Sequence, residues 1–129
     1  MSTGTTIFVL EDEAPVREVL KASLEGAGYA VEGFADGQSC LVRLGDAVPN
    51  LILLDMRMPR MDGYEFLDKL RANPDWRAVP VIIVSGLGEE LLRAVNARKA
   101  ERLGVVGIFA KPFDVPTLLR YVRSTLARA

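Results

Sequence analysis

Five short apolar runs, separated by segments with helical patterning, constrain the fold of this chain more than any other feature. The runs are TIFVL at 6–10, YAVEGF at 29–34, LILLD at 51–55, VPVIIVS at 79–85 and VVGIFA at 105–110. The first, third and fourth runs are continuously apolar and do not alternate with polar residues. Because a strand inside a parallel sheet is covered on both faces, a continuous apolar run is typical of parallel strands.

Each run is followed by a segment whose apolar residues fall on one helix face. The expected helices begin near Pro15, run from Asp36 to Leu44, cover 62–73 and 89–104, and begin again after Asp114. Proline suits a first helical turn, and aspartate suits an N-cap. Five strand and helix alternations predict an α/β protein with a doubly wound five-stranded parallel sheet and five helices.

Length and composition indicate one globular domain and exclude several kinds of partner. The chain has 129 residues, half of them hydrophobic, which fits a single domain over 1–129 with its core at about 5–127. The 16 basic and 17 acidic residues argue against nucleic-acid binding by this domain. No apolar run reaches about 18 residues and no signal sequence precedes the first run, so we expect a cytoplasmic protein without a membrane segment.

Polar residues follow four of the five runs. Glu11 and Asp12 follow the first run, Asp55 ends the third, Ser85 ends the fourth and Lys111 follows the fifth. In doubly wound sheets ligands bind outside the carboxyl ends of the strands, so these side chains are expected at one rim. Neighbouring carboxylates repel each other, and a hard cation such as Mg²⁺ relieves that repulsion while keeping several waters. The sequence therefore predicts a magnesium site at this rim.

Two competing kinds of site are disfavoured by individual positions. A nucleotide or flavin pocket requires a glycine-rich first turn that cradles phosphate, whereas this chain has the acidic segment EDEAP at 11–15. A phosphatase of the haloacid dehalogenase type requires a second acid two residues after its aspartate nucleophile. Arg57 occupies that position after Asp55.

The motifs VLEDE, LLDMRMPRMDG, VSG and KPF, in this order, resemble those of the receiver domain of two-component response regulators. The resemblance covers about residues 5–127. It implies a flavodoxin-like fold with strand order 2-1-3-4-5. It also implies a phosphoacceptor signalling switch, which catalyses only its own phosphorylation and dephosphorylation and is not an enzyme acting on other substrates.

By this resemblance Asp55 is the residue phosphorylated by a histidine kinase or phosphotransfer protein. Asp12 corresponds to the acid that binds Mg²⁺ directly, together with Asp55, and Glu11 to the acid that acts through a metal-bound water. Arg57 corresponds to the residue whose backbone carbonyl completes the metal site.

The resemblance also assigns Ser85 and Lys111 as the groups that hydrogen-bond the phosphoryl oxygens. The bond between Lys111 and Pro112 corresponds to the cis peptide of the family.

Two departures fall on the face that the family uses for output. Ile108 stands where the family usually has Tyr or Phe, and Phe109 is expected on the opposite face of its strand. The stretch between Ser85 and Lys111 is about one helical turn longer than usual. We expect output through the surface of 89–104, the last strand and the last helix, to a downstream protein target or effector domain or in a homodimer. Because the sequence ends at about Ala129, we expect this output to be protein–protein contact without an effector domain in the same sequence, and a phosphorylation-independent interaction module stays open as the alternative.

Overall fold

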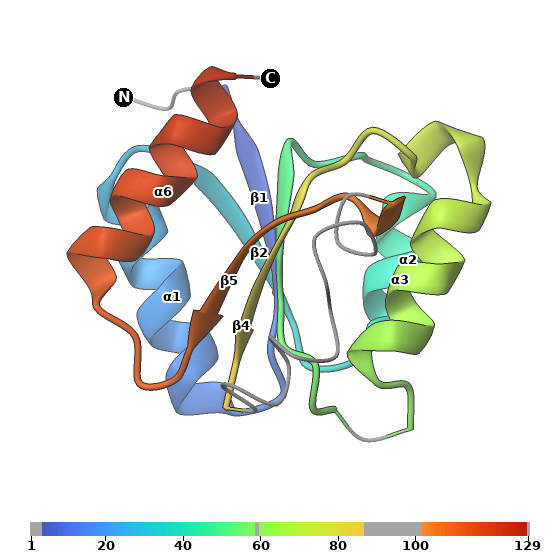
Figure 1. Cartoon of the computed structure of the whole chain (residues 1–129), viewed down its shortest axis with the longest axis horizontal. Helices are drawn as coiled ribbons and strands as arrows, with labels where there is room; N and C mark the ends of the chain where they lie inside the picture. The colour runs from blue at the N-terminus through green and yellow to red at the C-terminus, as the bar shows by residue number, and fades with distance from the viewer. Residues whose placement is uncertain (1–3, 59, 87–101, 129) are drawn as a thin grey trace.

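The computed structural model describes residues 4–58, 60–86 and 102–128. Its centre is a parallel five-stranded sheet in the order β2-β1-β3-β4-β5 (Figure 1). The strands are β1 (Thr6–Leu10), β2 (Ala30–Phe34), β3 (Leu51–Leu54), β4 (Val81–Ser85) and β5 (Val105–Ala110). The doubly wound α/β architecture and the strand order 2-1-3-4-5 are thereby confirmed.

Helices cover both faces of the sheet. α1 (Ala14–Gly26) and α6 (Val115–Ala127) lie on one face, and α2 (Gly37–Leu44) and α3 (Gly63–Ala72) lie on the other (Figure 1). A short 3₁₀ turn, η1 (Pro74–Trp76), follows α3. Four of the five predicted helices are confirmed, and the one predicted at 89–104 falls almost wholly outside the described residues. Within the described ranges no helix is both long and apolar enough to cross a membrane.

The helix starts follow the local chemistry of the sequence. The carboxylate of Asp36 accepts a hydrogen bond from Ser39 N at 2.8 Å at the start of α2. Asp114 accepts one from Thr117 N at 3.0 Å at the start of α6. These side chains satisfy backbone N–H groups that have no partner within the first helical turn. The predicted caps are therefore confirmed, and they fix where each helix leaves the rim of the sheet.

The core consists of two apolar layers, one on each side of the sheet. Ile7 and Val9 pack toward α1 and α6, whereas Phe8 and Leu10 pack toward α2 and α3. All four side chains are at most 1% exposed. Burial on both faces explains why this run is continuously apolar.

A bulge interrupts the pairing of β5 with β4. Val105 and Gly107 pair with consecutive residues of β4, so Val106 is an extra residue in β5. After the bulge Ile108 packs in the layer of α2 and α3, and Phe109 packs in the layer of α1 and α6. The predicted placement of these two side chains on opposite faces is confirmed.

Candidate metal centre

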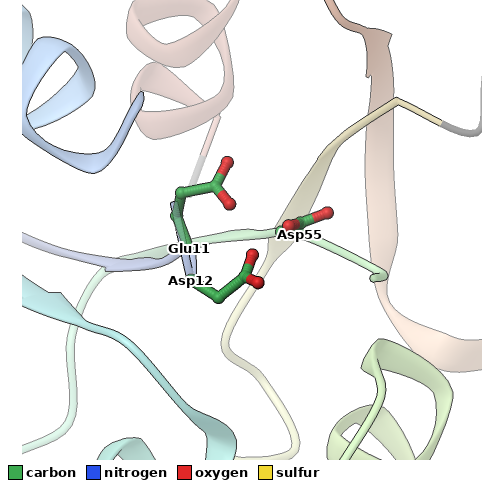
Figure 2. A group of neighbouring side chains, drawn as sticks. All are labelled: Glu11, Asp12 and Asp55. Carbon is green, nitrogen blue, oxygen red and sulfur yellow. The ribbon is translucent and has the colours of Figure 1, made fainter. Parts of the chain in front are cut away.

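Three carboxylates meet at the carboxyl ends of β1 and β3, which are adjacent strands. Figure 2 shows Glu11, Asp12 and Asp55 projecting to the same side of the strand ends, and one oxygen from each lies within 4.8 Å of the others. The backbone N–H of Glu11 donates to Phe34 O, and that of Asp55 donates to Leu10 O, both at 2.9 Å. The backbone hydrogen bonds of the sheet therefore extend one residue beyond β1 and β3 and hold Glu11 and Asp55 side by side.

Burial makes this cluster unusual. Glu11 is 1% exposed and Asp55 is 4% exposed. Burial, followed by the neighbouring Asp55, raises the pKa of Glu11 to about 7, although Lys111 opposes the shift. A carboxylate with so high a pKa is poorly stabilised in its charged form when no cation is bound.

Lys111 forms ion pairs with the acids in the described part of the chain. Its Nζ lies 2.5 Å from Glu11 Oε1, 3.6 Å from Glu13 Oε1 and 3.7 Å from Asp55 Oδ2. Burial works against the charge of Lys111, but the carboxylates outweigh it and raise its pKa. The contact with Glu11 is an ion pair. Glu11 Oε1 has no hydrogen-bond partner of acceptable geometry among the described residues.

A cleft of about 240 Å³ opens beside the acids. Its lining among the described residues is Asp12, Glu13, Asp55, Arg57, Gly86 and Lys111. Ser85 ends β4 next to this cleft and is 1% exposed. The backbone N–H of Lys111 donates to Ser85 O at 2.9 Å, so the structure brings these two predicted residues together through the main chain.

The turn after β3 is arranged around Asp55. The backbone N–H of Arg57 donates to Asp55 Oδ1 at 3.1 Å, and the side chain of Arg57 is exposed. Arg60 has a positive φ of 70°, and Gly63 N–H donates to Met56 O at 3.1 Å to close the turn. The peptide bond between Lys111 and the following proline is cis, as the resemblance implies.

Comparison with known proteins decides the family. The model of the response regulator receiver domain matches residues 7–123. The chain belongs to this family. Among receiver-containing relatives, the phosphate regulon transcriptional regulatory protein PhoB of Rhizobium meliloti is 32% identical over 95% of this chain and 52% of its own length. KdpE, the KDP operon transcriptional regulatory protein of Escherichia coli, is 35% identical over 96% of this chain and 52% of its own length.

Solved receiver structures agree with the fold. The receiver domain of a signal transduction histidine kinase from Syntrophus aciditrophicus superposes with a TM-score of 0.81 at 30% identity, covering 98% of this chain and 92% of that one. The chemotaxis response regulator CheY4 of Vibrio cholerae gives 0.82 at 27% identity, covering 95% and 99%. The chain spans about half the length of the curated relatives it matches.

Receiver domains bind Mg²⁺ at an acidic pocket, and the residues of this receiver domain fit such an ion. The donors are hard carboxylate oxygens, which Mg²⁺ prefers. Two of the three acids are buried, and Glu11 Oε1 has no directed hydrogen bond in the described structure. Glu11, Asp12 and Asp55 would hold the ion. The backbone carbonyl of Arg57 stays a predicted fourth ligand.

Two residues around the receiver site were given no role from the sequence. Glu13 approaches Lys111, and its backbone N–H donates to Glu11 Oε2 at 3.3 Å. Its place in the acidic run at 11–13 predicted a position at the rim but no separate role. Arg17 Nη1 donates to the backbone carbonyl of Glu11 at 2.8 Å. An arginine on a helix has no local signature for such a contact, because its acceptor is a main-chain group six residues away.

Proposed function

We propose that this receiver domain is a phosphoacceptor switch in which Asp55 accepts a phosphoryl group from a histidine kinase or phosphotransfer protein. The observation that supports this best is the placement of Asp55. Its carboxylate is buried, shares a 4.8 Å cluster with two further acids, and lies 3.7 Å from Lys111 Nζ. A buried acid held beside both a cation site and a lysine is suited to phosphoryl transfer.

The transfer forms an oxygen–phosphorus bond at Asp55 and breaks the phosphorus–nitrogen bond to the donor histidine, which leaves with its electron pair. An oxygen of the Asp55 carboxylate is the nucleophile. Bound Mg²⁺ would supply charge neutralisation for the phosphoryl oxygens. Lys111 would move from its carboxylate partners to the phosphoryl group, and the hydroxyl of Ser85 would donate a hydrogen bond to it.

Output would follow through the surface of β5 and α6, together with 89–104. Arg120 and Arg123 on α6 are exposed, so this surface offers positive charge to an acidic partner or to a symmetric dimer contact. The chain matches only half of regulators such as PhoB and KdpE. The receiver of this protein would act on a downstream target or on an effector domain. We also expect the loop after Ser85 to act as a hinge, because Gly86 and Gly88 make it pliable, although beyond Gly86 it lies outside the described residues.

The test is incubation with acetyl phosphate and Mg²⁺, followed by intact-protein mass spectrometry. We expect the wild-type protein to gain one phosphoryl group and to lose it slowly by hydrolysis. Asp55→Asn should gain none, because an amide is not a nucleophile. Asp68→Asn removes an exposed acid from α3 and should label like the wild type.

Two outcomes would count against the proposal. Full labelling of Asp55→Asn at another residue would show that Asp55 is not the acceptor. Absence of labelling in the wild type, both with acetyl phosphate and with a panel of histidine kinases, would favour the phosphorylation-independent interaction module.

A further inference from the structure

Arg17 reaches from α1 to the end of β1. Its Nη1 donates to the backbone carbonyl of Glu11 at 2.8 Å. The backbone N–H of Glu11 donates to Phe34 O at 2.9 Å. The paired residues of β1 and β2 end at Leu10 and Phe34, so the guanidinium supplies a donor where the strand ladder stops. Both main-chain polar groups of Glu11 are therefore held.

The side-chain stem of Arg17 rests on a residue without a side chain. A methyl group built on Gly33 of β2 would lie 3.2 Å from Arg17 Cδ and 3.3 Å from Arg17 Cγ. Such contacts are closer than ordinary packing, so a methyl group at position 33 would require the arginine stem to shift by a few tenths of an ångström. Arg17 and Gly33 are thus a matched pair at the edge of the sheet.

The carbonyl that Arg17 holds belongs to the peptide between Glu11 and Asp12. A planar peptide has no internal freedom, so fixing this carbonyl also fixes the chain direction into Asp12. We propose that Arg17 is a positioning residue for the two acids of β1, and that it strengthens Mg²⁺ binding by holding this peptide. The inference rests on the proposed metal site.

The charge of Arg17 and its hydrogen bond to the Glu11 carbonyl should have opposite effects on Mg²⁺ affinity. Arg17 is a cation in contact with the main chain of one of the three acids, so a purely electrostatic view expects Mg²⁺ to bind more tightly when the charge is removed. Arg17→Met keeps the stem and removes both the charge and the donor. We expect the Mg²⁺ dissociation constant to rise about three- to tenfold, the size of one ordinary hydrogen bond after its exchange with water.

Arg43→Met is the matched control. Arg43 Nε pairs with Glu32 Oε1 of β2 at 2.8 Å, so this change removes the same charge from an arginine that also contacts the edge strand. It does not touch the Glu11 carbonyl, and we expect its Mg²⁺ dissociation constant to stay within twofold of the wild type. Arg17→Lys restores a donor and should recover part of the affinity.

Gly33→Ala tests the same contact without altering Arg17. The new methyl group should displace the arginine stem and weaken Mg²⁺ binding in the wild-type background. In the Arg17→Met background, where no hydrogen bond remains to be displaced, it should have little further effect. A coupling of this kind between the two positions is what a double-mutant cycle measures.

The measurement is Mg²⁺ titration followed by NMR amide shifts, with urea unfolding of each metal-free variant as a separate readout of stability. Equal or tighter Mg²⁺ binding by Arg17→Met, or an equal loss in Arg43→Met, would overturn the inference. If Arg17→Met does not fold, Gly33→Ala decides, and unchanged affinity in that variant would overturn it. A wild-type protein that binds no Mg²⁺ would instead overturn the metal site of the proposed function, and the inference with it.

Discussion

The guanidinium of Arg71 occupies the space that a side chain at Gly104 would need. A methyl group built on Gly104 would lie 2.7 Å from Arg71 Cζ, and the φ of Gly104 is +70°. Arg71 donates to the carbonyls of Leu103 at 2.6 Å and Val79 at 2.7 Å, and further to those of two residues between α3 and β4. One side chain of α3 therefore ties together the chain segments that lead into β4 and β5.

Arg71→Met should lower the free energy of unfolding by about 2–4 kcal/mol, because it leaves several partly buried carbonyls without a donor. Urea unfolding measures the effect. Arg77→Met is the control, since Arg77 is exposed and its side chain should contribute less than about 0.5 kcal/mol. A loss below 1 kcal/mol in Arg71→Met would show that water replaces the guanidinium at these carbonyls.

Arg60→Gly should stabilise the protein. Arg60 has a φ of 70°, a conformation that costs a residue with a side chain about 1–2 kcal/mol and that glycine adopts freely. Part of the gain is offset by the greater freedom of glycine in the unfolded chain, so we expect a net increase of about 0.5–1 kcal/mol. Thermal unfolding measures it. Arg77→Gly, at a φ of −60°, should instead destabilise, and a gain in both variants would reject this explanation.

The metal-free protein should lose stability as pH rises from about 5 to 8. The pKa of Glu11 is about 7 in the folded protein and 4.5 ordinarily. Between these values the folded state binds a proton that the unfolded state releases, so the free energy of unfolding falls with rising pH, by about 1–3 kcal/mol. Urea unfolding across this range measures the slope. Glu11→Gln should flatten it, and an unchanged slope in that variant would assign the effect to another group.

Asp12→Ala should raise the melting temperature of the metal-free protein, because it removes one of three mutually repelling carboxylates. Mg²⁺ should stabilise the wild type by mass action and should stabilise this variant much less. Thermal unfolding with and without Mg²⁺ separates the two effects. Asp68→Ala serves as the control for loss of an exposed acid. Equal stabilisation of wild type and Asp12→Ala would show that Asp12 is not a ligand.

Local patterns predicted the sheet and the acids of the candidate site. Continuous apolar runs identified the strands, and the position of Asp55 at the end of the third run placed it at the rim of the sheet. Both are local patterns of neighbouring residues. The contacts of Arg17 and Arg71 could not be predicted in this way. Their acceptors are main-chain carbonyls, which every residue carries, so only the folded arrangement reveals which carbonyl is reached. The positive φ of Arg60 could not be predicted from the sequence either, because arginine rarely adopts a positive φ.

The residues of the candidate site lie far apart in the sequence, so the ribosome adds them in a fixed order: the three acids first and Lys111 later. The three acids follow β1 and β3, which pair with each other, whereas Lys111 follows β5. At about 5–20 residues per second, a ribosome adds Lys111 roughly 3–11 s after Asp55. During that interval the nascent acids lack Lys111, the lysine that pairs with them in the folded protein. Cellular cations can therefore reach these acids before Lys111 is made.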